Sequence, residues 1–153
     1  MTKYYHISFG TKKIGKLING KLLFLDKKDH FFNSVWKEAA KENKYDGYIE
    51  YSIELPDNLF TDEIKPGTNK ILRITKNNKK AYEKIINEIH KIKNNNKKYP
   101  RQILVEYLER NNYIGIDMKE INLLARKWLF KDELVLFNFD NLNKLKIEEI
   151  VKF

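Results

Sequence analysis

Two side chains stand out as groups that can carry acid–base or electrostatic chemistry, a histidine near the start of the chain and a glutamate near its end. His6 lies in the segment Tyr-Tyr-His-Ile-Ser at 4–8, where its imidazole can present both ring nitrogens to a cleft lined by aromatic rings. Glu133 opens the apolar run 134–137. Each residue also has a plainer interpretation, His6 as a hydrogen-bonded core or edge histidine and Glu133 as a carboxylate that keeps a strand end in water.

Several familiar catalytic patterns are absent from the sequence. None of its six glycines forms G-x-x-x-x-G-K or G-x-G-x-x-G, and there is no G-x-S-x-G elbow. No metal site is expected, because the chain has no cysteine and its three histidines are far apart. The lack of cysteine also excludes disulfides and a thiol nucleophile, and it is typical of chains that fold in a reducing compartment, so a cytoplasmic protein is expected.

The net charge of +9 raises the question of a nucleic-acid partner. Only four of the 30 basic residues are arginine, the type that favours base reading and bidentate phosphate contacts, and the lysines are spread along the chain. We therefore interpret most of the charge as solvated surface. A nucleic-acid-binding module, supported by the lysines at 76–98, stays open as an alternative.

The apolar pattern predicts the elements that position these residues. Strands are expected at 4–8 and 22–25, followed by a helix that Asp29 caps and whose apolar stripe should bury Trp36. The clearest strand is 48–55, where apolar and polar residues alternate as in a half-buried antiparallel strand.

The middle of the chain is predicted to be helical, and its last third to return to strands. Helices are expected at 78–93 and 100–111 with a solvated loop at 94–98 between them, a brief helical piece at 121–125, and strands at 70–75, 113–117, 133–139 and 145–151. The long connection at 56–69 has two turn signals, and loops of that length are often functional. A tight turn at Asp140-Asn141 is expected to join the last two strands into a hairpin.

This element order indicates an α+β fold, because strands at both ends enclose helices and do not alternate with them regularly. At 153 residues the chain is expected to form one domain over its full length. No stretch approaches the ~18 apolar residues of a membrane helix, so no membrane association is expected.

Three segments together resemble the ADP-ribosyltransferase superfamily, in the branch whose signature is His–Tyr–Glu. They are the first strand with Tyr-His at 5–6 and Ser8, the Leu-Leu-Phe-Leu-Asp strand at 22–26 before a helix, and the segment Asp-Glu-Leu-Val-Leu-Phe-Asn at 132–138 with Lys-Ile at 146–147. In that branch the first motif reads Y-H-G-S/T, and the third reads E-Y-x-V-Y/F-N/D before a hairpin that ends in I-K-I. The resemblance implies two packed, mainly antiparallel sheets around an NAD cleft with flanking helices.

The resemblance also implies roles for individual residues. His6 corresponds to the histidine that binds the adenine-side ribose of NAD, Ser8 to the hydroxyl that helps hold the nicotinamide amide, and Phe24 to the ring that stacks on nicotinamide. Trp36, on the following helix, is a candidate second wall of that site. Glu133 corresponds to the catalytic glutamate, which binds the nicotinamide ribose and stabilises the oxocarbenium-like charge that develops as the glycosidic bond breaks.

The expected function is therefore transfer of ADP-ribose from NAD, as a substrate and without a metal, to a macromolecule, with a protein target favoured and nucleic acid open. Two positions depart from the family pattern. Ile7 stands where a glycine usually follows the histidine, and Phe24 lacks the hydroxyl of the usual tyrosine. These departures favour an alternative, a catalytically inactive member of the fold that acts as a bacterial or phage effector by binding a protein partner.

Overall fold

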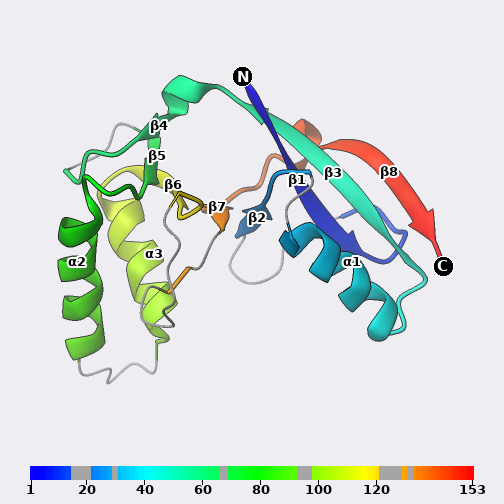
Figure 1. Cartoon of the computed structure of the whole chain (residues 1–153), viewed down its shortest axis with the longest axis horizontal. Helices are drawn as coiled ribbons and strands as arrows, with labels where there is room; N and C mark the ends of the chain where they lie inside the picture. Colours follow the sequence, from blue (N-terminus) through cyan, green and yellow to red (C-terminus); the bar gives the residue numbers. More distant parts are fainter. Residues whose placement is uncertain (15–21, 29–30, 66–68, 93–97, 121–128, 131–132) are drawn as a thin grey trace. The chain divides into compact units, whose positions relative to one another are not determined.

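The structure, a computed structural model, describes residues 1–14, 22–28, 31–65, 69–92, 98–120, 129–130 and 133–153. Over these residues the chain is an α+β protein with two sheets, of three and five strands, and three α-helices (Figure 1). It divides into two compact units: unit 1 comprises Met1–Asp57 with Asn138–Phe153, and unit 2 comprises Asn58–Phe137. The predicted α+β class is confirmed, whereas the single domain over 1–153 stays a prediction.

Unit 1 is built on an antiparallel sheet of three strands in the order β1-β3-β8. These strands are β1 (Thr2–Phe9), β3 (Gly47–Leu55) and β8 (Lys146–Lys152). Alternation along β1 and β3 puts Tyr4, Ile49, Tyr51 and Ile53 on one face, where all four are buried. The alternating pattern at 48–55 therefore predicted both the strand and its buried face.

A short strand and a helix complete unit 1. β2 (Leu23–Leu25) is followed by Asp26, which forms an antiparallel bridge with Tyr5 of β1 through two backbone hydrogen bonds of 2.7 and 2.9 Å. The helix α1 (Phe31–Glu42) contacts both β1 and β3. Asp29, the predicted N-cap of this helix, lies outside the described residues.

The prediction that this helix buries Trp36 is wrong, because the side chain is 46% exposed. Polar and small residues occupy the covered side of α1. Asn33 is buried and donates a hydrogen bond of 2.9 Å to the carbonyl of Lys27, while Nζ of Lys37 lies 3.3 Å from Oε2 of the buried Glu50 on β3. Because these polar groups find partners beneath the helix, they can be covered while Trp36 stays at the surface.

Unit 2 contains four strands in the order β7-β6-β5-β4. They are β4 (Phe60–Thr61), β5 (Lys70–Arg73), β6 (Tyr113–Asp117) and β7 (Leu134–Leu136). The neighbours β4, β5 and β6 are parallel, whereas β7 is antiparallel to β6. A parallel pair needs a long crossover, and the chain between β5 and β6 supplies it with α2 (Lys79–Lys91) and α3 (Pro100–Arg110).

The two helices of unit 2 lie side by side and bury one stripe each (Figure 1). The apolar side chains buried in this unit include Tyr82 and Ile86 from α2, Leu104 and Leu108 from α3, and Ile71, Leu72, Ile116, Leu134 and Val135 from the strands. Pro100 is the first residue of α3, a position where its missing N–H costs nothing. Both helices were predicted from their 3.6-residue period, with ends one or two residues off.

Three predicted features differ from the structure or are not covered by it. The connection at 56–69 contains a 3₁₀ turn at Asp57–Leu59 and the strand β4. The predicted final hairpin is wrong, because β7 pairs with β6 whereas β8 pairs with β3 in the other sheet. The helical piece at 121–125 and most of the loop at 94–98 lie outside the described residues.

In the part of the chain that the structure covers, no helix has the length and apolar character needed to cross a bilayer.

Candidate functional site

His6 and Phe24, from the first and second segments of the resemblance, are in direct contact in unit 1. Nδ1 of His6 on β1 lies 2.8 Å from the carbonyl oxygen of Phe24 on β2. A carbonyl only accepts hydrogen bonds, so Nδ1 donates and carries the ring proton. In the neutral imidazole Nε2 then holds a lone pair, which suits it to accept a hydrogen bond from a ligand hydroxyl.

The environment of His6 favours this neutral form. Burial lowers the pKa of His6 from its ordinary 6.5, and the hydrogen bond to Phe24 opposes that shift without cancelling it. At neutral pH the imidazole is therefore uncharged, and the hydrogen bond to Phe24 fixes its tautomer.

We expect His6 to titrate below pH 6.5, with the proton on Nδ1 at neutral pH. The unfolded chain then binds the proton first, so the free energy of unfolding should decrease as the pH falls from 6.5 towards the folded-state pKa, and should be unaffected by this group above that window. NMR of the ring protons and nitrogens, assigned with the His6→Gln spectrum, measures the pKa and the tautomer. A folded-state pKa at or above 6.5, or a proton on Nε2, would contradict this assignment.

Ser8 lies on the same face of β1 as His6, because the two are separated by two residues in a regular strand. Trp36 lies against the opposite face. Its ring contacts Phe9, with 6.0 Å between ring centroids, and Phe9 is an odd number of residues from His6. The structure therefore brings together His6 and Ser8 on one face, and places Trp36 against the other.

The departure at Ile7 causes no irregularity in the strand. Ile7 is paired with Glu50 in a continuous β1–β3 register that runs to Phe9. Among the described glycines, positive φ occurs at Gly10, beyond the end of the strand. Position 7 thus has ordinary extended backbone, which a branched side chain adopts without strain.

Glu133 belongs to unit 2, immediately before β7. Its carbonyl oxygen accepts a hydrogen bond of 2.9 Å from the N–H of Met118, which follows β6. Its side-chain Oε2 is buried. The glutamate is therefore anchored through its backbone to the end of the neighbouring strand, with one carboxylate oxygen shielded from water.

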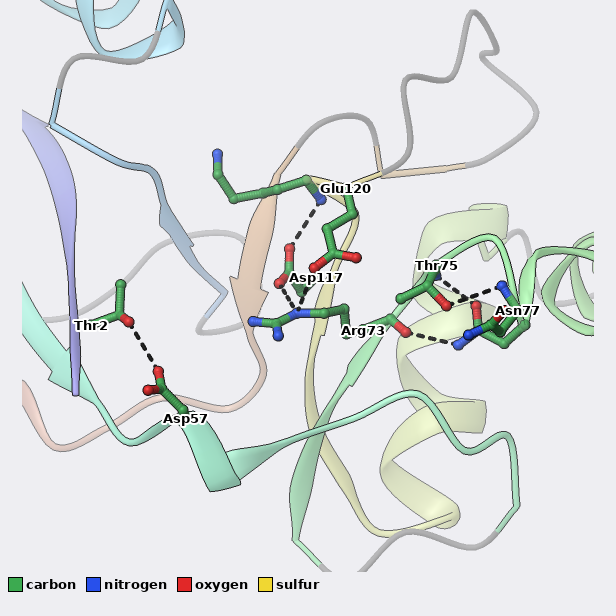
Figure 2. A network of polar contacts seen from close by, with 9 residues as sticks. Thr2, Asp57, Arg73, Thr75, Asn77, Asp117 and Glu120 are labelled. Carbon is green, nitrogen blue, oxygen red and sulfur yellow. Dashed lines mark hydrogen bonds and ion pairs between the residues drawn. The ribbon is translucent and has the colours of Figure 1, made fainter.

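A charged network that the sequence did not reveal lies at the same edge of the unit 2 sheet (Figure 2). Arg73, the last residue of β5, donates a hydrogen bond of 2.9 Å from Nε to Oδ2 of Asp117, the last residue of β6. Oε1 of Glu120 lies 3.7 Å from the same Nε. The guanidinium also stacks over the ring of Phe60 on β4, with its central carbon 4.1 Å from the ring centroid.

Asp117 ties several segments together at this edge. Its other carboxylate oxygen accepts a hydrogen bond of 3.0 Å from the N–H of Lys119, and its carbonyl accepts one of 2.9 Å from the N–H of Ile74. The Asp117 side chain is 4% exposed, against 30% for Arg73 and 55% for Glu120. The aspartate is thus the buried anchor of the network, and part of the arginine reaches solvent.

The loop after β5 is held by one buried amide. Asn78 accepts a hydrogen bond of 2.7 Å from the N–H of Thr75, and its side-chain nitrogen donates to the carbonyls of Arg73 and Asp62 at 2.7 and 2.8 Å. These bonds fix the backbone directly after Arg73 and join it to the residue that follows β4. The carboxyl ends of β4 and β5 are therefore fixed relative to each other.

The register places Glu133 and Arg73 at one edge of one sheet. Arg73 is opposite Asp117, and Asp117 is opposite Leu134, the residue after Glu133. Residues at the carboxyl ends of parallel strands commonly form ligand sites. A charged residue at the end of each apolar run, at 73 and 117, was the available sequence signal, but the parallel pairing that brings them together was not predicted.

Across the described ranges, no three histidine, aspartate or glutamate side chains are grouped so that they can hold a metal ion. Comparisons of the chain with protein-family models, with curated proteins and with solved structures found no match.

Proposed function

We propose that the chain is an NAD-dependent ADP-ribosyltransferase that transfers ADP-ribose to a macromolecular target. The observation that carries the proposal is the hydrogen bond between His6 Nδ1 and the carbonyl of Phe24. It joins the first two segments of the resemblance and leaves Nε2 as the hydrogen-bond acceptor, which is the state needed to bind a ribose hydroxyl. Ser8, on the same face of β1, is the proposed partner of the nicotinamide amide.

Glu133 is the proposed catalytic residue. As the bond between nicotinamide and ribose breaks, its electrons leave with nicotinamide and positive charge develops on the ribose. A carboxylate held beside that charge stabilises the transition state more than the ground state, and it does so most strongly where water is excluded. The buried Oε2 of Glu133 supports this role. The nucleophile of the target then bonds to the anomeric carbon and loses its proton.

Labelled ADP-ribose tests this proposal. We expect the wild-type chain, incubated with NAD labelled in its adenylate phosphate and with a mixture of proteins and RNA, to attach the label covalently to a macromolecule. His6→Ala should reduce labelling at low NAD concentration, and this loss should diminish as NAD approaches saturation, because His6 acts in binding. Labelling that is equal with and without the chain would contradict the proposal. Binding of an unlabelled protein partner would then favour the inactive effector.

Salt dependence separates the nucleic-acid alternative. Binding of DNA or RNA that persists without NAD and weakens steeply with added salt would favour a basic nucleic-acid-binding module, because lysine–phosphate contacts release counterions.

A further inference from the structure

We propose that Arg73 binds the phosphate attached to the nicotinamide ribose of the substrate. This inference rests on the proposed function, since it takes the nicotinamide ribose to be bound by Glu133, and it adds a residue that neither the sequence nor the resemblance indicated. The two residues belong to the same unit and lie at the same edge of its sheet.

The guanidinium of Arg73 is oriented before any ligand arrives. Its Nε edge is held by Asp117 at 2.9 Å, and its plane lies over Phe60. Figure 2 shows the two terminal nitrogens directed away from Asp117 and Glu120. A planar guanidinium fixed in this way loses little conformational freedom when it forms paired hydrogen bonds to a phosphate.

Solvent exposure allows a ligand to approach this group. The Arg73 side chain is 30% exposed, whereas Asp117 beneath it is 4% exposed. The buried aspartate is therefore the internal partner of the guanidinium and the solvent side is where a ligand binds. Glu120, 55% exposed and 3.7 Å from Nε, is a weak, screened partner that competes with an incoming anion.

The spacing of the strands suits one half of a dinucleotide. Arg73 and Leu134 are both register partners of Asp117, so their Cα atoms are two strand spacings apart, about 10 Å. Glu133 directly precedes Leu134. A ribose beside Glu133 places its 5′-phosphate a few bonds away, within the reach of a long arginine side chain across one intervening strand. The preferred ligand fragment is therefore nicotinamide mononucleotide.

Calorimetric binding of nicotinamide mononucleotide and of nicotinamide riboside tests this inference, because the two probes differ only in the phosphate. We expect the wild-type chain to bind the mononucleotide at least about tenfold more tightly. Arg73→Gln should abolish that difference and leave riboside affinity unchanged. Arg73→Lys should retain part of it, because the charge stays while the planar geometry is lost.

Two further variants give the opposite and the orthogonal result. Glu120→Gln should tighten mononucleotide binding and leave riboside binding unchanged, because it removes the competing anion. Glu133→Gln should weaken both probes to a similar extent. Thermal unfolding midpoints of all variants near that of the wild type show that the changes are local.

The inference and the proposed function fail separately. Equal affinity of the wild type for the two probes, failure to bind the mononucleotide, or an unchanged preference in Arg73→Gln would overturn the inference, even if NAD is cleaved. A phosphate preference that depends on Arg73 supports the inference, even if no nicotinamide is released from NAD, in which case the proposed transferase activity is what fails.

Discussion

Replacing Glu133 by glutamine is expected to lower the rate of nicotinamide release from NAD by about 10²–10³-fold. Glutamine has nearly the same shape and keeps hydrogen-bonding capacity, so the backbone hydrogen bond from Met118 should persist. What is lost is the negative charge beside the developing oxocarbenium ion. The reduction should appear in kcat more than in KM, because the lost interaction is strongest in the transition state.

A matched variant controls for the loss of one carboxylate elsewhere in unit 2. Glu88 on α2 is about three-quarters exposed and pairs with Lys91 on the same helix, so Glu88→Gln removes the same charge far from the β5–β6–β7 edge in sequence. It should leave kcat and KM unchanged. If Glu133→Gln also retains wild-type kinetics while the wild type is active, Glu133 is not the catalytic residue and a different carboxylate must be sought.

Replacing Gly115 by alanine is expected to cost about 3 kcal/mol of unfolding free energy. A Cβ at this position of β6 would lie 2.5 Å from the carbonyl oxygen of Val135 on β7, and 3.1 Å from a side-chain carbon of Leu136. The first contact is with backbone, so it is relieved only by moving one strand away from the other. Gly115 is the register partner of Leu136, so the pairing that positions Glu133 is affected directly.

Thermal unfolding measures this effect. A loss of about 3 kcal/mol in a chain of this size should lower the unfolding midpoint by about 6–12 °C. Glu109→Ala, at an exposed position of α3, should shift it little. An unchanged midpoint for Gly115→Ala would show that β6 and β7 are not packed as closely as described.

Local periodicity was enough to predict most elements, because each reports a face that must be buried. The alternation at 48–55 and the helical stripes of α2 and α3 are of this kind. Trp36 shows where the reasoning fails. Its apolar stripe favoured burial, but Asn33 and Lys37 of the same helix found polar partners beneath it. Whether such partners exist depends on a strand distant in sequence, so the pattern of α1 alone does not predict it.

Strand partners were beyond the reach of local patterns for a similar reason. The turn residues after β7 indicate a reversal of the chain but do not say which strand comes next to which, and β7 and β8 belong to different sheets. The same limit hid the Arg73–Asp117 pair, because two residues 44 positions apart meet only through the parallel pairing of β5 and β6. His6 and Glu133 were identified by residue type and by resemblance, and their roles stay predictions.

Release of free nicotinamide from NAD by the purified wild-type chain tests the central claim most directly. Chromatography quantifies it with water alone and with protein or RNA acceptors present, beside a reaction that contains Glu133→Gln. The account predicts release well above the uncatalysed rate for the wild type, and loss of that excess in the variant. No release above the uncatalysed rate under any of these acceptors would contradict it.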